Sequence, residues 1–183
     1  MGKQYPEITT GLKEWIEDQK IFFVATAPLS QAGHINCSPK GLDSFRVIGP
    51  HKVVYQDLTG SGIETIAHLK ENGRVVIMLC AFQGTPKIIR LHGNGDVIEP
   101  GHPEFESMTT LFPPRIGMRA YISINVTRIA DSCGYSIPLY EFQKERDVLD
   151  KVCIKKGEEG LKSYRAEKNK ESIDGMKGLG PVI

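Results

Sequence analysis

The sequence has no surplus of either charge, no long apolar run and no paired cysteines. Its 183 residues include 23 basic and 22 acidic side chains, so no net field would attract nucleic acid or an anionic membrane. No charge-free apolar run approaches the length of a membrane span, and the first residues lack the apolar segment of a signal peptide. We therefore expect a cytoplasmic location, and neither a nucleic-acid nor a membrane partner.

Sequence motifs for metal binding, redox chemistry and the familiar phosphate loops are also missing. The four cysteines form no C-x-x-C pair, and the five histidines show no H-E-x-x-H or similar spacing. We expect no metal site and reduced, mostly structural cysteines. The dinucleotide fingerprint would need a glycine at Thr65, and a P-loop would need Gly-Lys followed by Ser or Thr. Any phosphate bound here is held by a different arrangement.

The residues that are present indicate one β-rich domain. An apolar content of 40% over this length is enough for one well-buried domain and short for two. We predict a single domain, 1–183, with a barrel core at about 21–130 and a C-terminal helical extension at about 139–183. The expected fold is β-rich α+β: an antiparallel barrel of about six strands with flanking helices. Strands are expected at 21–27, 34–40, 47–49 continued by 52–56, 74–82, 87–98 and 119–129, and helices at 8–20, 61–72, 103–111 and within 141–170.

Two further features follow from proline and glycine. Pro39 cannot donate to a central ladder, so it should lie at a sheet edge or at a strand end; an edge would leave main-chain groups open to a planar ligand. The glycine-rich tail 172–183 is expected to be mobile unless a partner subunit holds it.

A glycine-rich turn, 59–62, joins a predicted strand to a predicted helix. Ser61 and Glu64 have the spacing of a capping box, which predicts the start of the helix. The first turn of a helix has free N–H groups and the positive end of the dipole, and flanking glycines let an anion approach closely. The turn is therefore a candidate phosphate site. The alternative is a capped helix after a tight turn, with no ligand.

Several strings together resemble the pyridoxamine 5′-phosphate oxidase-like flavoproteins. They are S-P-K-G at 38–41, Y-Q-D-L-T-G-S-G-I-E-T at 55–65, E-N-G-R at 71–74, C-A-F at 80–82 and R-L-H-G-N-G-D-V at 90–97. Two later strings, D-S-C-G-Y-S-I-P at 131–138 and N-K-E-S-I-D-G at 169–175, resemble one subgroup. The resemblance implies a split β-barrel that forms a homodimer and binds FMN in clefts at the subunit interface.

The resemblance also implies which residues contact FMN. The stretch 36–41 would lie along the flavin ring and ribityl chain, the strand end 56–58 would face the flavin, and the turn 59–62 would hold the phosphate through backbone N–H groups and the hydroxyls of Thr59 and Ser61. The full set of cofactor-binding candidates is Asn36, Cys37, Ser38, Pro39, Lys40, Gly41, Gln56, Asp57, Leu58, Thr59, Gly60, Ser61, Gly62, Arg90, Cys133 and Tyr135.

The sequence differs from that of the oxidase at the positions whose basic side chains would balance the charge of the phosphate. The oxidase has an Arg-Lys pair after the serine that corresponds to Ser61, whereas this chain has Gly62 and Ile63. The candidates to replace that pair are Arg90, Lys87 and Lys40; the alternative for Arg90 is a strand residue that points to solvent. Cys133 is either a nucleophile or a packed cysteine. Tyr135 either stacks on the flavin of a partner subunit or packs at the dimer interface.

Three functions stay open at this point. The first is an FMN-dependent oxidoreductase with a small-molecule electron donor or acceptor, in which the flavin carries the redox chemistry. No side chain stands out as a catalytic acid or base, so catalytic residues are unassigned. The second is a flavin-binding or flavin-sensing protein without turnover. The third is a haem-binding or haem-degrading split-barrel protein, for which His34 or His92 would be the axial ligand.

Overall fold

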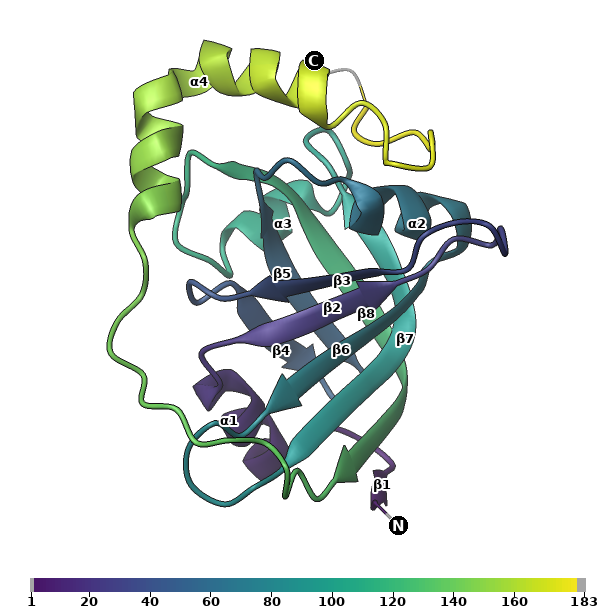
Figure 1. The fold of residues 1–183 in the computed structure, drawn as a ribbon, viewed down its shortest axis with the longest axis vertical. Coiled ribbons are helices and arrows are strands. Elements are labelled where there is room, and N and C mark those ends of the chain that lie inside the picture. Colours follow the sequence, from purple (N-terminus) through teal and green to yellow (C-terminus); the bar gives the residue numbers. More distant parts are fainter. Residues whose placement is uncertain (1, 181–183) are drawn as a thin grey trace.

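In the computed structural model, which describes residues 2–180, eight strands form one antiparallel sheet that curls into a split barrel (Figure 1). The strand order is β3-β2-β6-β7-β8-β5-β4, and the short β1 pairs with β8. The predicted class is confirmed, although there are more strands than the expected six. The strands are β1 (Gln4–Tyr5), β2 (Phe22–Thr26), β3 (Asn36–Lys40), β4 (Phe45–Gly49), β5 (Lys52–Leu58), β6 (Arg74–Cys80), β7 (Ile88–Ile98) and β8 (Met118–Ser132).

The barrel interior is filled by alternate residues of these strands. Val24, Ile77 and Leu91, from the neighbouring strands β2, β6 and β7, are completely buried, and so are Tyr55 and Ile122 across the barrel. Period-two alternation of β-branched and other apolar residues places one face of each strand inside. Burial of this apolar surface, at about 25 cal/mol per Å², holds the strands together.

The two edge strands define the opening of the barrel. β3 pairs only with β2, which confirms that the strand containing Pro39 lies at an edge, and β4 is the other end of the path. Burial alternates along β3, so Asn36, Ser38 and Lys40 are partly covered while Cys37 and Pro39 are exposed. Lys40 spans the opening to reach Asp57 on β5, at 2.9 Å. The edge of β3 and the end of β5 therefore face each other.

Four helices surround the sheet: α1 (Thr10–Asp18), α2 (Glu64–Asn72), α3 (Phe105–Thr109) and α4 (Val148–Lys168). The capping box predicted at the start of α2 is wrong. The N-cap is Ile63 and no side chain caps the helix; instead Oε2 of Glu64 accepts the N–H of Ile63 at 3.0 Å. The helix begins later than Ser61 because the carbonyls of the preceding turn bind other partners, described below.

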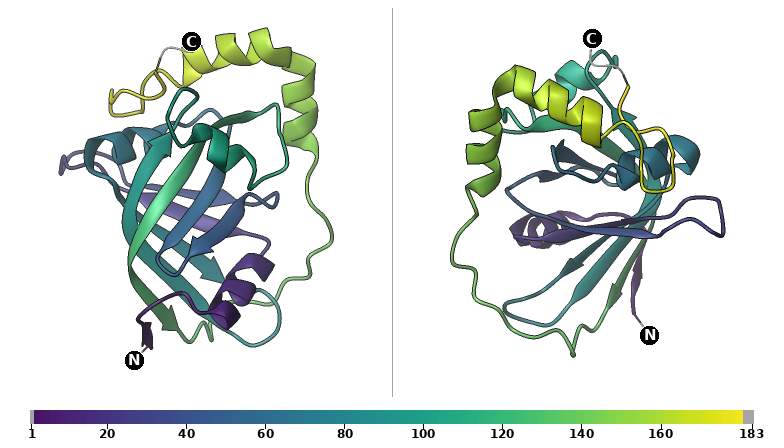
Figure 2. Two further views of the ribbon diagram at one scale, coloured as in Figure 1. Left: turned by 180° about the vertical axis from the view of Figure 1, so that it is seen from behind. Right: turned by 45° about the horizontal axis from the view of Figure 1, so that its top comes forward.

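A long extended segment, residues 133–147, leaves the end of β8, and we call it the strap. It passes along the outside of the barrel to α4, which bends at Gly157, where the backbone is left-handed with φ +63° (Figures 1 and 2). The second half of α4 crosses above the barrel end that carries α2 (Figure 2). No helix within residues 2–180 is long and apolar enough to cross a membrane.

The segment after α4 packs back onto the same chain. Lys70 of α2 donates to the carbonyl of Gly178 at 2.7 Å, the N–H of Ile173 donates to Glu64, and Leu179 packs against the core. The expectation of a mobile tail at 172–183 therefore does not hold as far as residue 180, because α2 provides its binding surface. The last three residues of the predicted extension lie outside the described part.

Candidate functional site

The turn Thr59–Gly62 lies at the end of β5, and the carbonyl groups of its last three residues accept hydrogen bonds on one side. Nδ2 of Asn169 donates to the oxygens of Gly60 and Ser61, at 2.9 and 3.4 Å. Nη1 of Arg119 donates to the oxygens of Gly62 and Gly60, at 3.0 and 3.4 Å. Two buried side chains, one from β8 and one from the end of α4, thus hold three successive carbonyls.

The other side of the turn is open. Gly60, Ser61 and Gly62 are exposed, and within residues 2–180 their main-chain N–H groups have no acceptor. A Cβ placed on Gly60 would meet no atom within 4 Å. Successive unpaired N–H groups on a glycine turn are an anion-binding arrangement. At Gly62 a carboxylate borders this open side, since a Cβ there would lie 2.6 Å from Oε2 of Glu64, which accepts from the N–H of Ile63. The turn is therefore an exposed row of N–H donors with Glu64 at one end.

Thr59 differs from the rest of the turn. Its side chain is buried, its hydroxyl donates to the oxygen of Gly117 at 2.8 Å, and it accepts from Nε of Arg165 at 2.9 Å. The expectation that the Thr59 hydroxyl donates to the phosphate is wrong, because that hydroxyl is already used on the buried side. Only Ser61 presents a hydroxyl to solvent.

Charged side chains lie behind the turn. Asp57 is completely buried between Arg119 Nε at 2.6 Å and Lys40 Nζ at 2.9 Å. Burial alone would raise the pKa of Asp57, but the charges and hydrogen bonds of Lys40 and Arg119 outweigh it and lower that pKa. Arg165 adds a further cation, whose pKa is lowered by burial and by the charge of Arg119. Three cations against one carboxylate leave a net charge of +2 beneath the turn.

Sequence reasoning missed Arg119, Arg165 and Asn169. Arg119 stands at the start of an alternating strand and reads as an ordinary strand residue. Arg165 lies in a helix with charges of both signs, a pattern that is typical of a solvent-exposed helix. Asn169 was present in the string 169–175, but nothing in one sequence places it 2.9 Å from Gly60. Only the tertiary fold brings these residues together.

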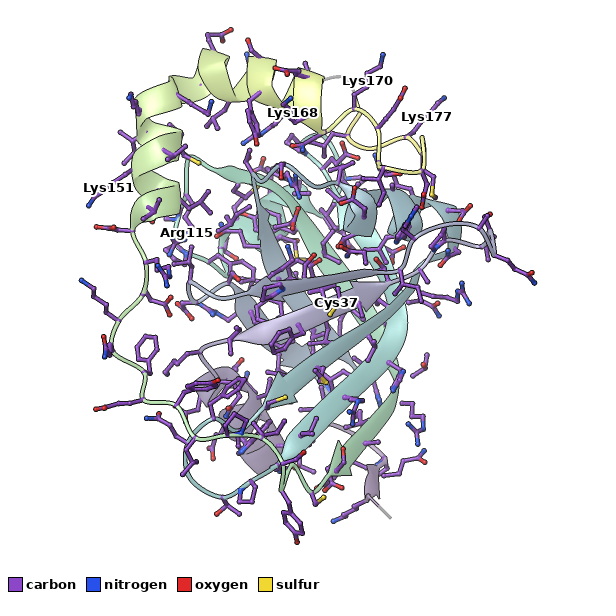
Figure 3. All side chains as sticks on the ribbon, in the orientation of Figure 1. Cys37, Arg115, Lys151, Lys168, Lys170 and Lys177 are labelled. Atoms are coloured by element: carbon purple, nitrogen blue, oxygen red, sulfur yellow. The ribbon has the colours of Figure 1, made fainter. Side chains whose placement is uncertain are left out.

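The candidates on β3 are divided between its two faces. Asn36 donates to Oγ1 of Thr65 on α2 at 2.9 Å and accepts from the Ser38 hydroxyl at 3.1 Å, so both side chains fix the strand to the helix. Cys37 lies on the outer face of β3, in the middle of the open edge (Figure 3). Main-chain groups of Ser38, Pro39, Lys40 and Gly41, rather than their side chains, are what this edge offers to a ligand.

On β5, the predicted residues point away from solvent. Gln56 is buried toward the loop after α3, and its Nε2 donates to the oxygen of Pro113 at 3.3 Å. Asp57 points the opposite way, to the cation cluster, and Leu58 is half-buried beside the turn. Asp57 thus acts beneath the turn, on its cations, rather than on a ligand.

The remaining candidates lie at the other end of β8. Arg90 pairs in register with Ala130 and donates to Ser132 at 2.7 Å, and Lys87 lies over the ring of Trp15 at 4.8 Å. The turn, in contrast, adjoins Met118 at the start of that strand. Neither basic residue can meet a phosphate at the turn of its own chain. Cys133 is exposed rather than packed, and Tyr135 is 82% exposed.

A cavity of about 930 Å³ lies beside the open edge of β3. Its walls are the end of β3, the residues after α1, and the strap together with the first turns of α4. Phe82, Tyr140 and Phe142 give it an apolar lining, and Lys20 and Lys40 lie at its margin. No cluster of metal-ligating side chains exists within residues 2–180.

Comparison of this sequence with known proteins identifies its family. A family model described as pyridoxamine 5′-phosphate oxidase matches residues 8–133. This chain belongs to the pyridoxamine 5′-phosphate oxidase family. A protein of Aspergillus flavus, the pyridoxamine 5′-phosphate oxidase family protein ustO, is 38% identical over 194 residues, which cover 96% of this chain and 77% of the relative. The similarity to that family member includes the C-terminal extension.

Solved structures share the fold of the pyridoxamine 5′-phosphate oxidase family at low identity. HupZ of Group A Streptococcus is 21% identical, with a TM-score of 0.53 over 73% of this chain and 99% of that one. A Lactobacillus delbrueckii protein, described as a proposed pyridoxamine 5′-phosphate oxidase, is 14% identical, with a TM-score of 0.53 over 69% of this chain and 98% of that one. These similarities support the barrel fold.

Proposed function

We propose that this family member binds FMN and acts as an FMN-dependent oxidoreductase, with the turn Thr59–Gly62 holding the phosphate. The observation that carries the proposal is the two-sided turn: N–H groups of Gly60, Ser61 and Gly62 are open to solvent, and a cluster of net charge +2 lies behind them. A phosphate dianion favours such a combination of backbone donors and cations. The edge of β3 would offer main-chain groups to the flavin ring.

The bound flavin would supply the electron transfer, and the protein would position it. The ionisable groups nearest the turn are engaged. Asp57 is paired with Lys40 and Arg119, and Arg165 donates to Thr59 and Met118. The carboxylate of Glu64 accepts from the N–H groups of Ile63 and Ile173. These residues hold the site, and none is free to move a proton to or from a substrate. The same observation favours, as a second candidate, a flavin-binding protein without turnover.

The absorption spectrum of the purified protein tests cofactor binding. We expect a two-banded flavin spectrum and release of FMN on denaturation. In titrations of the apoprotein, FMN should bind at least tenfold more tightly than riboflavin, because only FMN has the phosphate that the turn would bind. Equal affinities would contradict the phosphate site, and a Soret band would favour haem. Reduction of the bound FMN by a nicotinamide donor and reoxidation by a specific acceptor would separate the oxidoreductase from the non-catalytic binder.

We further propose that two copies form a homodimer with FMN at the interface. The strap and the first half of α4 expose large apolar side chains that one chain leaves uncovered: Tyr135, Leu139, Tyr140, Phe142, Val148, Val152 and Ile154, each between 43% and 82% exposed. Apolar surface of this extent is typical of an interaction site. A second copy would also bring Arg90, Cys133 and Tyr135, which lie far from the turn of their own chain, toward the turn of its partner.

Sedimentation equilibrium tests the dimer. The wild type should have twice the mass of the 20.3 kDa chain. The double variant Tyr135→Ser, Leu139→Ser should dissociate at least tenfold more readily and bind FMN more weakly, because the interface loses apolar surface. Ile35→Ser, on an equally exposed residue of the β2–β3 hairpin, is the matched control and should leave the mass unchanged. A wild-type monomer that binds FMN would contradict the dimer.

A further inference from the structure

The strongest unexplained feature is the way in which the end of α4 contacts the turn. Asn169 is completely buried, and its amide has three partners: Nδ2 donates to the oxygens of Gly60 and Ser61, while Oδ1 accepts from Nη1 of Arg119 at 3.0 Å. Arg119 in turn donates to Gly60 and Gly62. The two side chains therefore bind each other and, between them, three successive carbonyls.

The segment around Asn169 is itself fixed. The N–H of Leu179 donates to the oxygen of Asn169 at 3.0 Å, and a Cβ on Gly178 would collide with that oxygen and with Ile63. Earlier in α4, Cys153 approaches Gly117, the residue just before β8. A Cβ on Gly117 would lie 2.7 Å from Sγ of Cys153, so the glycine allows this close contact. Arg165, one helical turn before Asn169, fixes Thr59. The C-terminal segment thus reaches the turn through Arg165 and Asn169, and the packing around both is close.

Holding the carbonyls of a short turn on one side determines where its N–H groups point, because each peptide unit is planar and its N–H and C=O lie on opposite sides. Without Asn169, the oxygens of Gly60 and Ser61 would lose a donor in a buried setting, and two glycines would let the peptide units rotate. The N–H groups would then have to be ordered by the ligand at the time of binding, at the expense of affinity.

We propose that Asn169 is a positioning residue for the phosphate site: by holding the oxygens of Gly60 and Ser61 from behind, it makes the N–H groups of Ser61 and Gly62 face an incoming phosphate before binding. This inference rests on the proposed function, since it takes the turn as the FMN phosphate site. The family model matches only residues 8–133, so Arg165 and Asn169 belong to the extension and not to the matched barrel. In this chain the barrel supplies the turn, and the extension fixes its shape.

The test is the ratio of FMN to riboflavin affinity, measured by fluorescence quenching on the full chain. Asn169→Ala should weaken FMN binding by about tenfold to hundredfold while riboflavin binding changes less than twofold, because riboflavin lacks the phosphate. Asn72→Ala is the matched control: it removes hydrogen bonds of an asparagine to Ala27 and Arg74 at the other end of α2, and it should leave the ratio unchanged.

A second variant keeps the test decisive if Asn169→Ala does not fold. Thr59→Val keeps the volume of the side chain but removes the hydroxyl that joins Arg165 to Gly117. That hydroxyl is buried, so any loss must act through the position of the turn; we expect a threefold to tenfold loss for FMN alone. The positioning role is contradicted if the folded variants keep the wild-type ratio of FMN to riboflavin affinity, or if their affinities for FMN and riboflavin fall equally. A wild type that binds no FMN would instead overturn the proposed function.

Discussion

Replacing Asp57 with asparagine is expected to lower the free energy of unfolding by about 3–5 kcal/mol, since breaking a buried ion pair leaves uncompensated charge behind. Arg119, with a side chain 6% exposed, and Lys40 would lose the one carboxylate that pairs with them within residues 2–180, and the +2 cluster would become +3. Urea unfolding followed by circular dichroism measures the change. Glu159→Gln, which removes one charge of an exposed pair with Lys162, is the control and should change stability by less than about 0.5 kcal/mol.

The pH dependence gives a second measure of the same interaction. Because the pKa of Asp57 is lower in the folded than in the unfolded protein, its contribution to stability is present at neutral pH and is lost as the pH falls below about 4. The wild type should therefore lose stability between about pH 4 and pH 2 more steeply than Asp57→Asn does. Equal acid slopes, or an Asp57→Asn variant as stable as the control, would show that the pair contributes little.

Introducing a carboxylate at the turn is expected to have the second large effect. Ser61→Asp should weaken FMN binding by about tenfold to hundredfold, because a negative charge about 5 Å from a phosphate dianion costs about 1.5–3 kcal/mol at a partly solvated site. Ser61 is exposed and its side chain has no partner within residues 2–180, so the fold should tolerate the substitution. Isothermal titration with FMN at low salt measures the loss.

The control for this charge is Ser61→Asn, which has nearly the same shape as Asp but no charge. It should bind FMN within threefold of the wild type, and added salt should reduce the difference between the two variants because exposed charges are screened. If Ser61→Asp binds FMN as tightly as Ser61→Asn, the phosphate lies elsewhere. A loss of the same size in both variants would indicate a steric effect, not an electrostatic one.

Most of the fold could be predicted from the sequence, because its elements carry strong local patterns. Alternating burial along β8 and the apolar run of β6 are visible in single segments, and Pro39 correctly indicated an edge strand. The start of α2 was placed wrongly because the capping box is a local rule. In the folded chain Asn169, more than a hundred residues away, occupies the carbonyls of Gly60 and Ser61.

For the turn Thr59–Gly62, the sequence indicated the exposed N–H groups but only part of the charged cluster behind them. Glycines at 60 and 62 and the family resemblance both indicate an anion-binding turn, and the N–H groups of residues 60–62 have no acceptor in the described part of the chain. Of the three expected cations, Lys40 belongs to the charged cluster behind the turn, whereas Arg90 and Lys87 lie at the other end of the barrel of the same chain. The sequence did not indicate Arg119 and Arg165, whose positions are set by barrel closure and by the path of the strap. Charge placement depends on tertiary contacts, which local patterns do not contain.

The long reach of the strap and α4 also has a consequence for the order in which the chain is completed. All eight strands described above lie before residue 133, but Arg165 contacts Thr59 across 106 residues and Asn169 contacts Gly60 across 109. Contacts between such distant residues form late, because loop closure must come first and synthesis proceeds from the N-terminus. A nascent chain that has only reached the end of β8 contains these strands, the turn and Arg119, but it lacks Arg165 and Asn169, the two contacts that the C-terminal segment makes with the turn.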